Sequence, residues 1–195
     1  MKIICIENNY SEIKNEPLLS LKPETALLRK NHPFYIPEFT NDVRCEVGIL
    51  LKSCKNGRHI SEKFADTYFQ ELALAVNFVA HDVLVNNLQK QLPTDIARGF
   101  DFSMSVGDFI NKENFSKKKS IDFRLDVNGK TLIAGNTREM KFPFNTSISF
   151  FSKYFFLKTG DFIFTGGKKS DYQLRIGDHL EAFISEEKAL NCLIK

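Results

Sequence analysis

Glu46 lies in an apolar stretch of the chain, Val43–Leu51, which predicts a buried β-strand. Residues two apart on a strand point to the same face of the sheet. An acid at each of two such positions makes a two-pronged ligand for a hard cation. Here position 46 carries a carboxylate, whereas position 48 carries Gly48, which has no side-chain ligand atom. By itself the stretch predicts a strand with one candidate metal ligand.

Other residues have side chains suited to proton transfer or to anion binding. His81 is a candidate acid or base because histidine is the residue type that most readily exchanges protons near neutral pH, although a solvated histidine at the edge of a core is the commoner role for such a residue. Arg98 has a planar fork suited to bidentate carboxylate binding, but it stays protonated and cannot act as a base. Lys168 and Lys169 are interpreted most simply as part of a solvated loop, and Asp82 as a structural residue that orients its neighbours.

The composition is that of a folded domain without a strong charge bias. The chain has 195 residues, of which 43% are hydrophobic and 26% charged, so it can bury a sizeable core. Phenylalanine is frequent (19 residues) and tryptophan is absent, which predicts a phenyl-rich core. The net charge is only +3, and the one basic run, Lys117–Lys119, is short. We therefore expect no nucleic-acid partner.

The cysteines and the first residues bear on the cellular compartment. Cys5, Cys45, Cys54 and Cys192 form no CxxC pair and no zinc-binding spacing, which favours reduced thiols buried as small hydrophobes. The apolar run at the start of the chain spans four residues, too few for a signal peptide or a membrane span. The expected location is cytoplasmic, with no membrane partner.

The first half of the chain predicts strands joined by irregular segments. We expect a short buried strand over 2–6, an irregular proline-containing arm over 7–37, and a strand over 43–52. Ser61 is a plausible N-cap for a helix over 62–71, in which Phe64, Tyr68 and Leu72 repeat every four residues. A buried strand over 72–80 and a short helix over 83–90 follow.

The second half contains the clearest local signal, a β-hairpin. Residues 121–127 alternate apolar and polar, Asn128-Gly129 is a type I′ turn pair, and a return strand covers 130–134. Asn145 is placed to cap a helix running to about 156. Three more strands are expected over 161–167, 179–184 and 189–194. The elements predict one β-rich α+β domain over 1–195, in which residues 1–40 form the first strand and the arm packed on the domain.

Several segments, in order along the chain, resemble the fumarylacetoacetate hydrolase family, especially its compact single-domain bacterial members. The matching segments are MKIIC and NNY near the start, LKPETALLR (21–29), EVGILL (46–51), GRHISEK (57–63), AHDV (80–83), IARGFD (96–101), NGK with GNT-x-x-M-x-F (128–142) and LKTGDFIFTG (157–166). Each segment is weakly specific, but the ordered series covers nearly the whole chain.

The resemblance implies a mixed β-roll or β-sandwich, and a homodimer. It also implies a pocket in which three carboxylates hold Mg²⁺, Mn²⁺ or Ca²⁺. Substrates in the family are small 2-oxo or 1,3-dicarbonyl acids, whose carbonyl the metal polarises while a C–C bond breaks or a double bond moves.

This chain departs from the family pattern at most of the implied metal and pocket positions. Glu46 matches the first metal carboxylate, Gly48 falls on the second and Asn77 on the third. His81 stands where the family has an arginine, and Arg98 where it has a lysine. Ligand charge therefore falls from three carboxylates to one, which weakens the capture of a hard cation.

Two loops of the implied pocket also differ. The family's Thr-Gly-Thr-Pro loop here comprises Thr165, Gly166, Gly167 and Lys168, so its second threonine and its proline are absent. The segment that matches the family's lid, Asn9–Ile13, lacks the lid's general-base histidine. These departures together predict a dismantled metal site.

The leading hypothesis is a divergent family member without the usual metal-dependent chemistry and with no metal cofactor. Arg98 and His81 are its candidate catalytic residues, and Arg98, Thr165, Gly166 and Lys168 its candidate binding residues for a small carboxylate. A first alternative is an active hydrolase, decarboxylase or isomerase of oxo-acids, with a weak Mg²⁺, Mn²⁺ or Ca²⁺ site at Glu46. A second alternative is a non-catalytic subunit of a hetero-oligomer.

Overall fold

A nine-stranded mixed sheet is the main element of the computed structural model, which describes residues 1–11 and 16–195. Two long antiparallel strands, β4 and β5, form its centre, and their register pairs Val43 with Ala80 and Ser53 with Phe69. The strands, in spatial order, are β2 (Leu19–Lys22), β1 (Ile3–Ile6), β10 (Phe162–Phe164), β4 (Val43–Ser53), β5 (Phe69–Ala80), β6 (Met104–Val106) and β3 (Leu27–Leu28), with β11 (Lys168–Lys169) beside β4 and β7 (Ile110–Asn111) beside β5.

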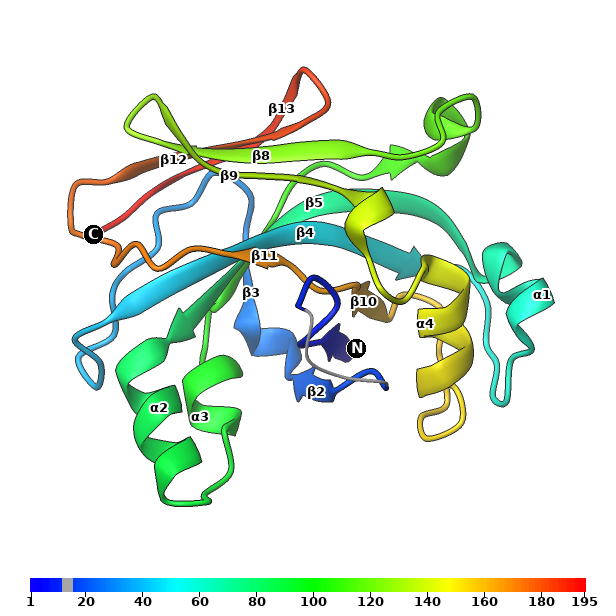
Figure 1. Cartoon of the computed structure of the whole chain (residues 1–195), viewed down its shortest axis with the longest axis horizontal. Coiled ribbons are helices and arrows are strands. Elements are labelled where there is room, and N and C mark those ends of the chain that lie inside the picture. Colours follow the sequence, from blue (N-terminus) through cyan, green and yellow to red (C-terminus); the bar gives the residue numbers. More distant parts are fainter. Residues whose placement is uncertain (12–15) are drawn as a thin grey trace.

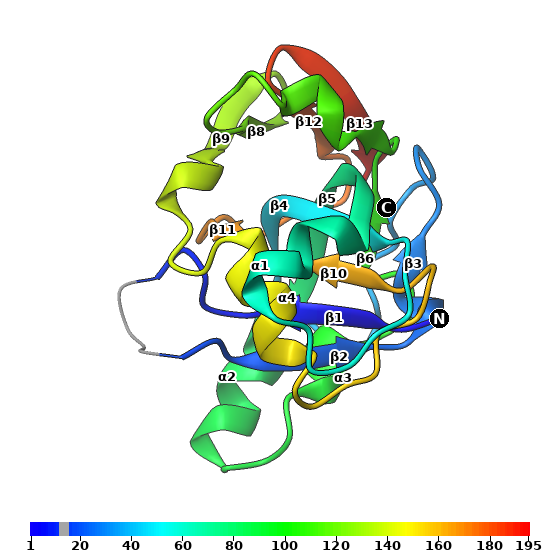
Figure 2. The same ribbon diagram turned by 90° about the vertical axis from the view of Figure 1, so that its right-hand side faces the viewer.

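A four-stranded antiparallel sheet covers one face of β4 and β5 (Figure 1). Its order is β13 (Glu187–Leu193), β12 (His179–Ile184), β8 (Asp122–Val127) and β9 (Lys130–Asn136). The predicted turn between β8 and β9 is confirmed, because Asn128 and Gly129 both have the positive φ angles, 51° and 76°, that a type I′ turn requires. Figure 2 shows β4 and β5 between this sheet and the β1–β2 pair.

The helices are short and lie at the ends of the sheets. They are α1 (Glu62–Ala65), α2 (His81–Gln89), α3 (Asp95–Arg98) and α4 (Phe144–Phe151), with 3-10 turns η1 (Glu24–Ala26), η2 (Asp66–Tyr68), η3 (Lys112–Phe115) and η4 (Thr137–Glu139). α2 packs with α3, and α1 packs with α4 on the opposite side of the molecule (Figure 1). No helix in the described part of the chain is both long and apolar enough to cross a membrane.

The two faces of β4 belong to different cores, and this separation positions the site. Val47, Ile49 and Leu51 point into a large core shared with the four-stranded sheet. Leu50 points the other way, into a smaller core with Cys5 of β1. By the same alternation Glu46 and Gly48 lie on the Leu50 face, toward the smaller core.

The β-rich α+β fold is confirmed, but three local predictions are wrong. The helix expected over 62–71 ends at Ala65, because Phe69 begins a strand that pairs with β4 over its whole length. The arm over 7–37 is not wholly irregular: β2 pairs with β1, and β3 pairs with β6. The helix expected up to about 156 ends at Phe151, and its N-cap is Pro143, with Asn145 inside the helix.

Candidate functional site

The register of β4 and β5 brings Glu46 directly opposite Asn77. Both side chains are buried, and Nδ2 of Asn77 donates a hydrogen bond to Oε2 of Glu46 over 3.4 Å. The other amide atom, Oδ1 of Asn77, is buried and has no hydrogen-bond partner among the described residues. Two residues that the sequence places at one site are therefore neighbours in the structure.

Two basic side chains face the other oxygen of Glu46. Nζ of Lys169 lies 3.3 Å from Oε1, and Nη1 of Arg98 lies 3.7 Å from the same oxygen. Lys169 reaches Glu46 because β11 pairs with β4 in a register that sets these two residues side by side. Burial raises the pKa of Glu46, and Glu7 raises it further, whereas Lys169 and Arg98 act in the opposite direction.

Glu7, directly after β1, is the second acid of this cluster. It accepts hydrogen bonds from Nη1 of Arg98 and from the hydroxyl of Ser20, and both side chains of the Glu7–Arg98 ion pair are nearly buried. Glu7 and Glu46 both face Nη1 of Arg98, so two acids share one guanidinium nitrogen.

A buried lysine supports the segment that carries Arg98. Lys22 is almost fully buried, and its Nζ donates to the backbone carbonyl of Arg98 and, over 2.9 Å, to Oγ of Ser103. Burial lowers the pKa of Lys22. Lys22 therefore fixes the C-terminal end of α3, from which the Arg98 side chain extends toward Glu7 and Glu46.

The chain between β10 and β11 runs along one edge of β4 and bulges over it at Gly48. β10 pairs with β4 as far as Leu50, and β11 resumes the pairing at Val47. A Cβ atom added to Gly48 would lie 2.0 Å from the carbonyl oxygen of Gly166. Real Cβ atoms essentially never come within 3.0 Å of another heavy atom, so the backbone of Gly166 occupies the space of any side chain at position 48.

The crossing segment itself requires glycine. Gly166 has a φ of +92°, a region that residues with a Cβ rarely adopt. A Cβ on Gly167 would lie 2.9 Å from Cβ of Glu46, so the backbone at Gly167 also lies too close to β4 for a side chain. Gly48, Gly166 and Gly167 form one backbone contact, which we call the glycine crossing.

Two adjoining cavities open beside the charged cluster. The larger has a volume of about 610 Å³, and the smaller has a volume of about 280 Å³. Both are lined by Glu7, Asn8, Ser11 and Lys169, and Arg98 lines the larger one. A small molecule in these cavities can therefore reach the side chains of Glu7, Arg98 and Lys169.

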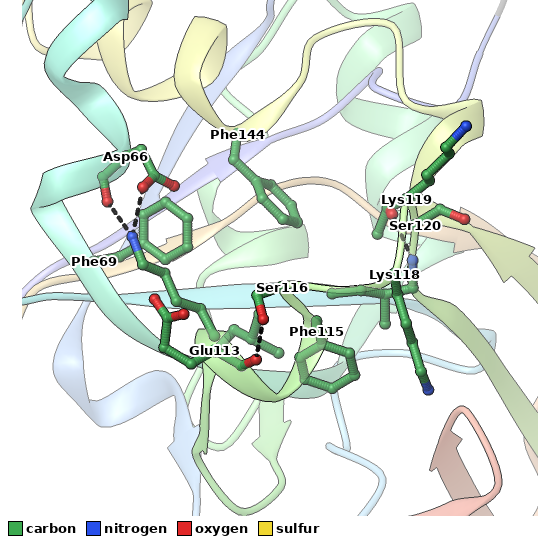
Figure 3. Close-up of a pocket in the computed structure, with 13 residues that line it drawn as sticks. Asp66, Phe69, Glu113, Phe115, Ser116, Lys118, Lys119, Ser120 and Phe144 are labelled. Atoms are coloured by element: carbon green, nitrogen blue, oxygen red, sulfur yellow. Dashed lines mark hydrogen bonds and ion pairs between the residues drawn. The ribbon is translucent and has the colours of Figure 1, made fainter.

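A third cavity lies elsewhere and, among the described residues, shares no lining residue with these two. It has a volume of about 360 Å³, and its walls include the rings of Phe69, Phe115 and Phe144 (Figure 3). Lys112 at its edge donates to the carbonyl and the carboxylate of Asp66 over 2.6 and 2.7 Å. No residue that the sequence predicts for the site lines this cavity.

A model of the fumarylacetoacetate hydrolase C-terminal domain matches residues 2–194. The chain belongs to this family. It is 31% identical to a protein named "Oxaloacetate tautomerase FAHD1, mitochondrial" from Bos taurus, over 93% of this chain and 86% of that protein. A solved structure of a fumarylacetoacetate hydrolase family protein from Yersinia pestis superposes with a TM-score of 0.93 at 28% identity, covering 100% of this chain and 92% of the other.

The same fold occurs in a structure described as fumarylpyruvate hydrolase from Pseudomonas aeruginosa in complex with Mn²⁺ and pyruvate. Its TM-score is 0.93, with coverage of 100% of this chain and 89% of that one, but only 18% of residues are identical, so the likeness shows the fold alone. In the described part of this fumarylacetoacetate hydrolase family chain, no group of three or more His, Cys, Asp or Glu residues is arranged to hold a metal.

His81 and Asp82, which match the family's Arg-Asp pair, lie at the start of α2. Nδ1 of His81 is 3.3 Å from a carboxylate oxygen of Asp42, and His81 lines neither of the two cavities beside Glu46. Asp82 accepts from the hydroxyl of Thr40 over 2.5 Å and from the backbone N–H of Asn41 over 2.8 Å. Although burial raises the pKa of Asp82, these hydrogen bonds hold it below its usual value. The structural interpretation of Asp82 is confirmed.

The remaining predicted binding residues divide between the loop backbone and the cavity. Thr165 is buried, and its hydroxyl donates to the carbonyl of Ile49 over 2.8 Å, which anchors the glycine crossing to β4. Gly166 contributes its backbone to the crossing. Lys168 lines the smaller cavity, and its Nζ lies 2.7 Å from Oε2 of Glu139.

The segment that matches the family's lid is partly described. Asn9 is buried and ties the crossing to the chain before α4, because its Nδ2 donates to the carbonyls of Thr165 and Phe142 over 2.7 and 3.0 Å. The hydroxyl of Tyr10 is buried without a partner among the described residues. Glu12 and Ile13, the positions at the end of this segment, lie outside the described residues.

The structure adds three residues that sequence reasoning missed. The sequence predicts Lys169 in a solvated loop, but the residue belongs to β11 and forms an ion pair with Glu46. Glu7 and Lys22 had no assigned role. Lys22 lies within the LKPETALLR segment that carries the family resemblance, which is a usable signal, whereas nothing in the local sequence marks Glu7 or Lys169.

Proposed function

We propose that this chain binds a small carboxylate without a divalent metal, in the cavity beside Arg98 and Lys169. The glycine crossing is the observation that supports this most strongly. The family pattern requires an acid at position 48, and here the Gly166 carbonyl lies where even the Cβ of that acid would stand. Gly48 on β4 and Gly167 on the segment before β11 lie against each other, since a Cβ on Gly48 would lie 3.0 Å from Cα of Gly167. The departures from the family pattern at these two positions therefore depend on each other.

The donor atoms that remain do not fit a hard divalent cation. Mg²⁺ and Mn²⁺ favour several oxygen ligands with negative charge, and here only Glu46 supplies a carboxylate at the family's metal positions. Oε1 of Glu46 faces Lys169 and Arg98, and Oε2 accepts from Asn77. A cation beside Glu46 would have to compete with two basic side chains that already neutralise this carboxylate.

The same charges favour an anion. Three basic side chains, Lys22, Arg98 and Lys169, surround the two acids Glu7 and Glu46. The Lys169 side chain is 52% exposed, so its ammonium is accessible from the cavities. The guanidinium of Arg98 presents several donors in a fixed fork, a geometry that suits a carboxylate.

Calorimetric titration of pyruvate and oxalate into the protein in the presence of EDTA tests this proposal. We expect saturable binding, which Lys169→Met weakens at least about tenfold, the effect of losing about 1.4 kcal/mol from one charge-assisted contact. Lys153→Met, which removes an exposed lysine that lines neither cavity, serves as the control and leaves the affinity unchanged. No heat of binding, or equal affinities for the Lys169 and Lys153 variants, refutes the proposal.

A second function, a metal-dependent enzyme acting on a small oxo-acid, is favoured by one observation. Among the described residues, buried Oδ1 of Asn77 has no hydrogen-bond partner beside Glu46, and an amide oxygen is an acceptable ligand for a hard cation. Because the Bos taurus relative is named an oxaloacetate tautomerase, oxaloacetate is a substrate to test. Tautomerisation or decarboxylation of oxaloacetate that requires Mg²⁺ or Mn²⁺ and is abolished by Glu46→Gln would establish this second function in place of the first.

A further inference from the structure

The larger cavity beside Glu46 is charged on one part of its wall and apolar on another. Arg98 and Lys169 contribute its basic groups. Leucines from two separate segments contribute its apolar surface: Leu18 and Leu19 at the start of β2, and Leu84 and Leu88 from α2. With a volume of about 610 Å³, the cavity has far more space than a two- or three-carbon acid needs.

Two of these leucines present apolar surface that the described residues leave exposed. Leu84 and Leu88 are four residues apart on α2, so they lie on the same face of the helix. Leu88 is 60% exposed and Leu18 is 41% exposed, although both line the cavity. An apolar group placed between them would remove this surface from water and gain the corresponding stabilisation.

The basic groups retain donors for an incoming carboxylate. Among the contacts of the described residues, Arg98 uses only Nη1, which faces Glu7 and Glu46. The half-exposed Lys169 faces Glu46 at 3.3 Å and keeps further N–H donors. A single carboxylate can therefore bind at the charged end without displacing either acid.

We propose that the ligand is a monocarboxylate with an unbranched aliphatic tail, an inference that rests on the carboxylate binding proposed above. The carboxylate binds at Lys169 and Arg98, and the tail lies along Leu18, Leu84 and Leu88. A dicarboxylate of similar length would place its second charge against the leucines, at the cost of desolvating it. The aliphatic tail distinguishes this ligand from short polar acids such as pyruvate and oxalate.

Titration with acetate, butanoate, hexanoate and octanoate, each in EDTA, tests the inference. Burial of each added methylene group predicts a Kd that tightens about fourfold per carbon. The neutral amide of hexanoic acid should bind at least about tenfold more weakly than hexanoate, because it lacks the charge that Lys169 attracts. If short and long acids bind equally, the tail is not recognised and this inference fails while carboxylate binding stands. If no carboxylate of any length binds, the proposed function fails as well.

A pair of matched leucine variants locates the tail. Leu88→Gln removes apolar surface from the cavity wall, and the dependence on chain length should fall to about twofold per carbon, with acetate affinity unchanged. Leu92→Gln is the control, because Leu92 is 51% exposed, lies just beyond α2 and does not line the cavity. Both substitutions fall on exposed residues, so the fold should tolerate them. An equal effect of the two variants, or none from Leu88→Gln, overturns the inference.

Discussion

Substitution of Gly48 by alanine tests the glycine crossing with a single added methyl group. The new Cβ would lie 2.0 Å from the carbonyl oxygen of Gly166 and 3.0 Å from Cα of Gly167, and both obstacles are backbone. The neighbouring chain cannot easily retreat, because Thr165 is hydrogen-bonded to Ile49 and Asn9 holds the carbonyl of Thr165. The substitution therefore forces β4 and the crossing apart.

Overpacking of this kind costs about 1–3 kcal/mol, and contact with two fixed backbone atoms places Gly48→Ala at the upper end, about 3 kcal/mol. The reduced freedom of the unfolded chain offsets about 0.5–1 kcal/mol of this. The net loss of about 2–2.5 kcal/mol corresponds to a fall in Tm of about 4–10 °C for a chain of this size. Gly48→Glu, which restores the family's acid, should be still less stable and should not create a metal site.

Thermal unfolding followed by circular dichroism, together with urea titration, measures this loss. Gly129→Ala is the matched control: a Cβ there meets no atom of the described residues within 4 Å, so its positive φ of +76° is what opposes the substitution, at about 1 kcal/mol. A Gly48→Ala protein as stable as the parent, or more stable than Gly129→Ala, would show that Gly166 does not fill the space beside position 48.

Three further predictions concern acid stability, thiol reactivity and assembly. Burial opposes ionisation of Asp161, but hydrogen bonds from the Lys2 side chain and from backbone N–H groups hold its pKa below the usual value. The ionised carboxylate therefore stabilises the fold above about pH 4, its unfolded pKa, and this stability is lost as the pH falls through the lower folded pKa. Thermal melts should show the Asp161→Asn variant less stable than the parent at pH 7 and nearly equal to it at about pH 2. A difference in Tm that does not change with pH would contradict this. Burial raises the pKa of both Cys5 and Cys45 to about 12, whereas Cys54 is only half-buried. A thiol reagent should therefore modify Cys54 first in the native protein. Rapid modification of more than one thiol would contradict this burial pattern. Light scattering after size exclusion should give twice the chain mass, as the family resemblance implies, and a monomer that pairs only with a different chain would favour the hetero-oligomer instead.

The sequence predicts the strands well where a strand is marked by its own residues. The β8–β9 hairpin has alternating residues and an Asn-Gly turn, and both are local signals. The segment 62–71 carries helical spacing as well as aromatic residues that suit a strand, and pairing of Phe69–Ala80 with β4 decides against the longer helix. Long-range pairing of this kind has no signature within the segment itself.

The residues of the candidate site, too, could be predicted from the sequence only in part. Glu46, Asn77 and Gly48 could be assigned from the order of family-like segments, and the structure places all three on β4 and β5. The partners of Glu46 could not be assigned, because Lys169 reaches it from a two-residue strand more than a hundred positions away. The family resemblance predicts that an acid is missing at 48, but only the fold shows that the Gly166 backbone occupies the space of any side chain there.

Titration of Mn²⁺ into the metal-free protein, followed by calorimetry and by electron paramagnetic resonance of the free ion, tests the central claim most directly. Because Glu46 is neutralised by Lys169 and Arg98 and the Gly166 backbone occupies the space beside position 48, we predict no saturable binding at millimolar Mn²⁺. Binding of one Mn²⁺ per chain, lost in the Glu46→Gln variant, would contradict the account and restore Glu46 as a metal ligand.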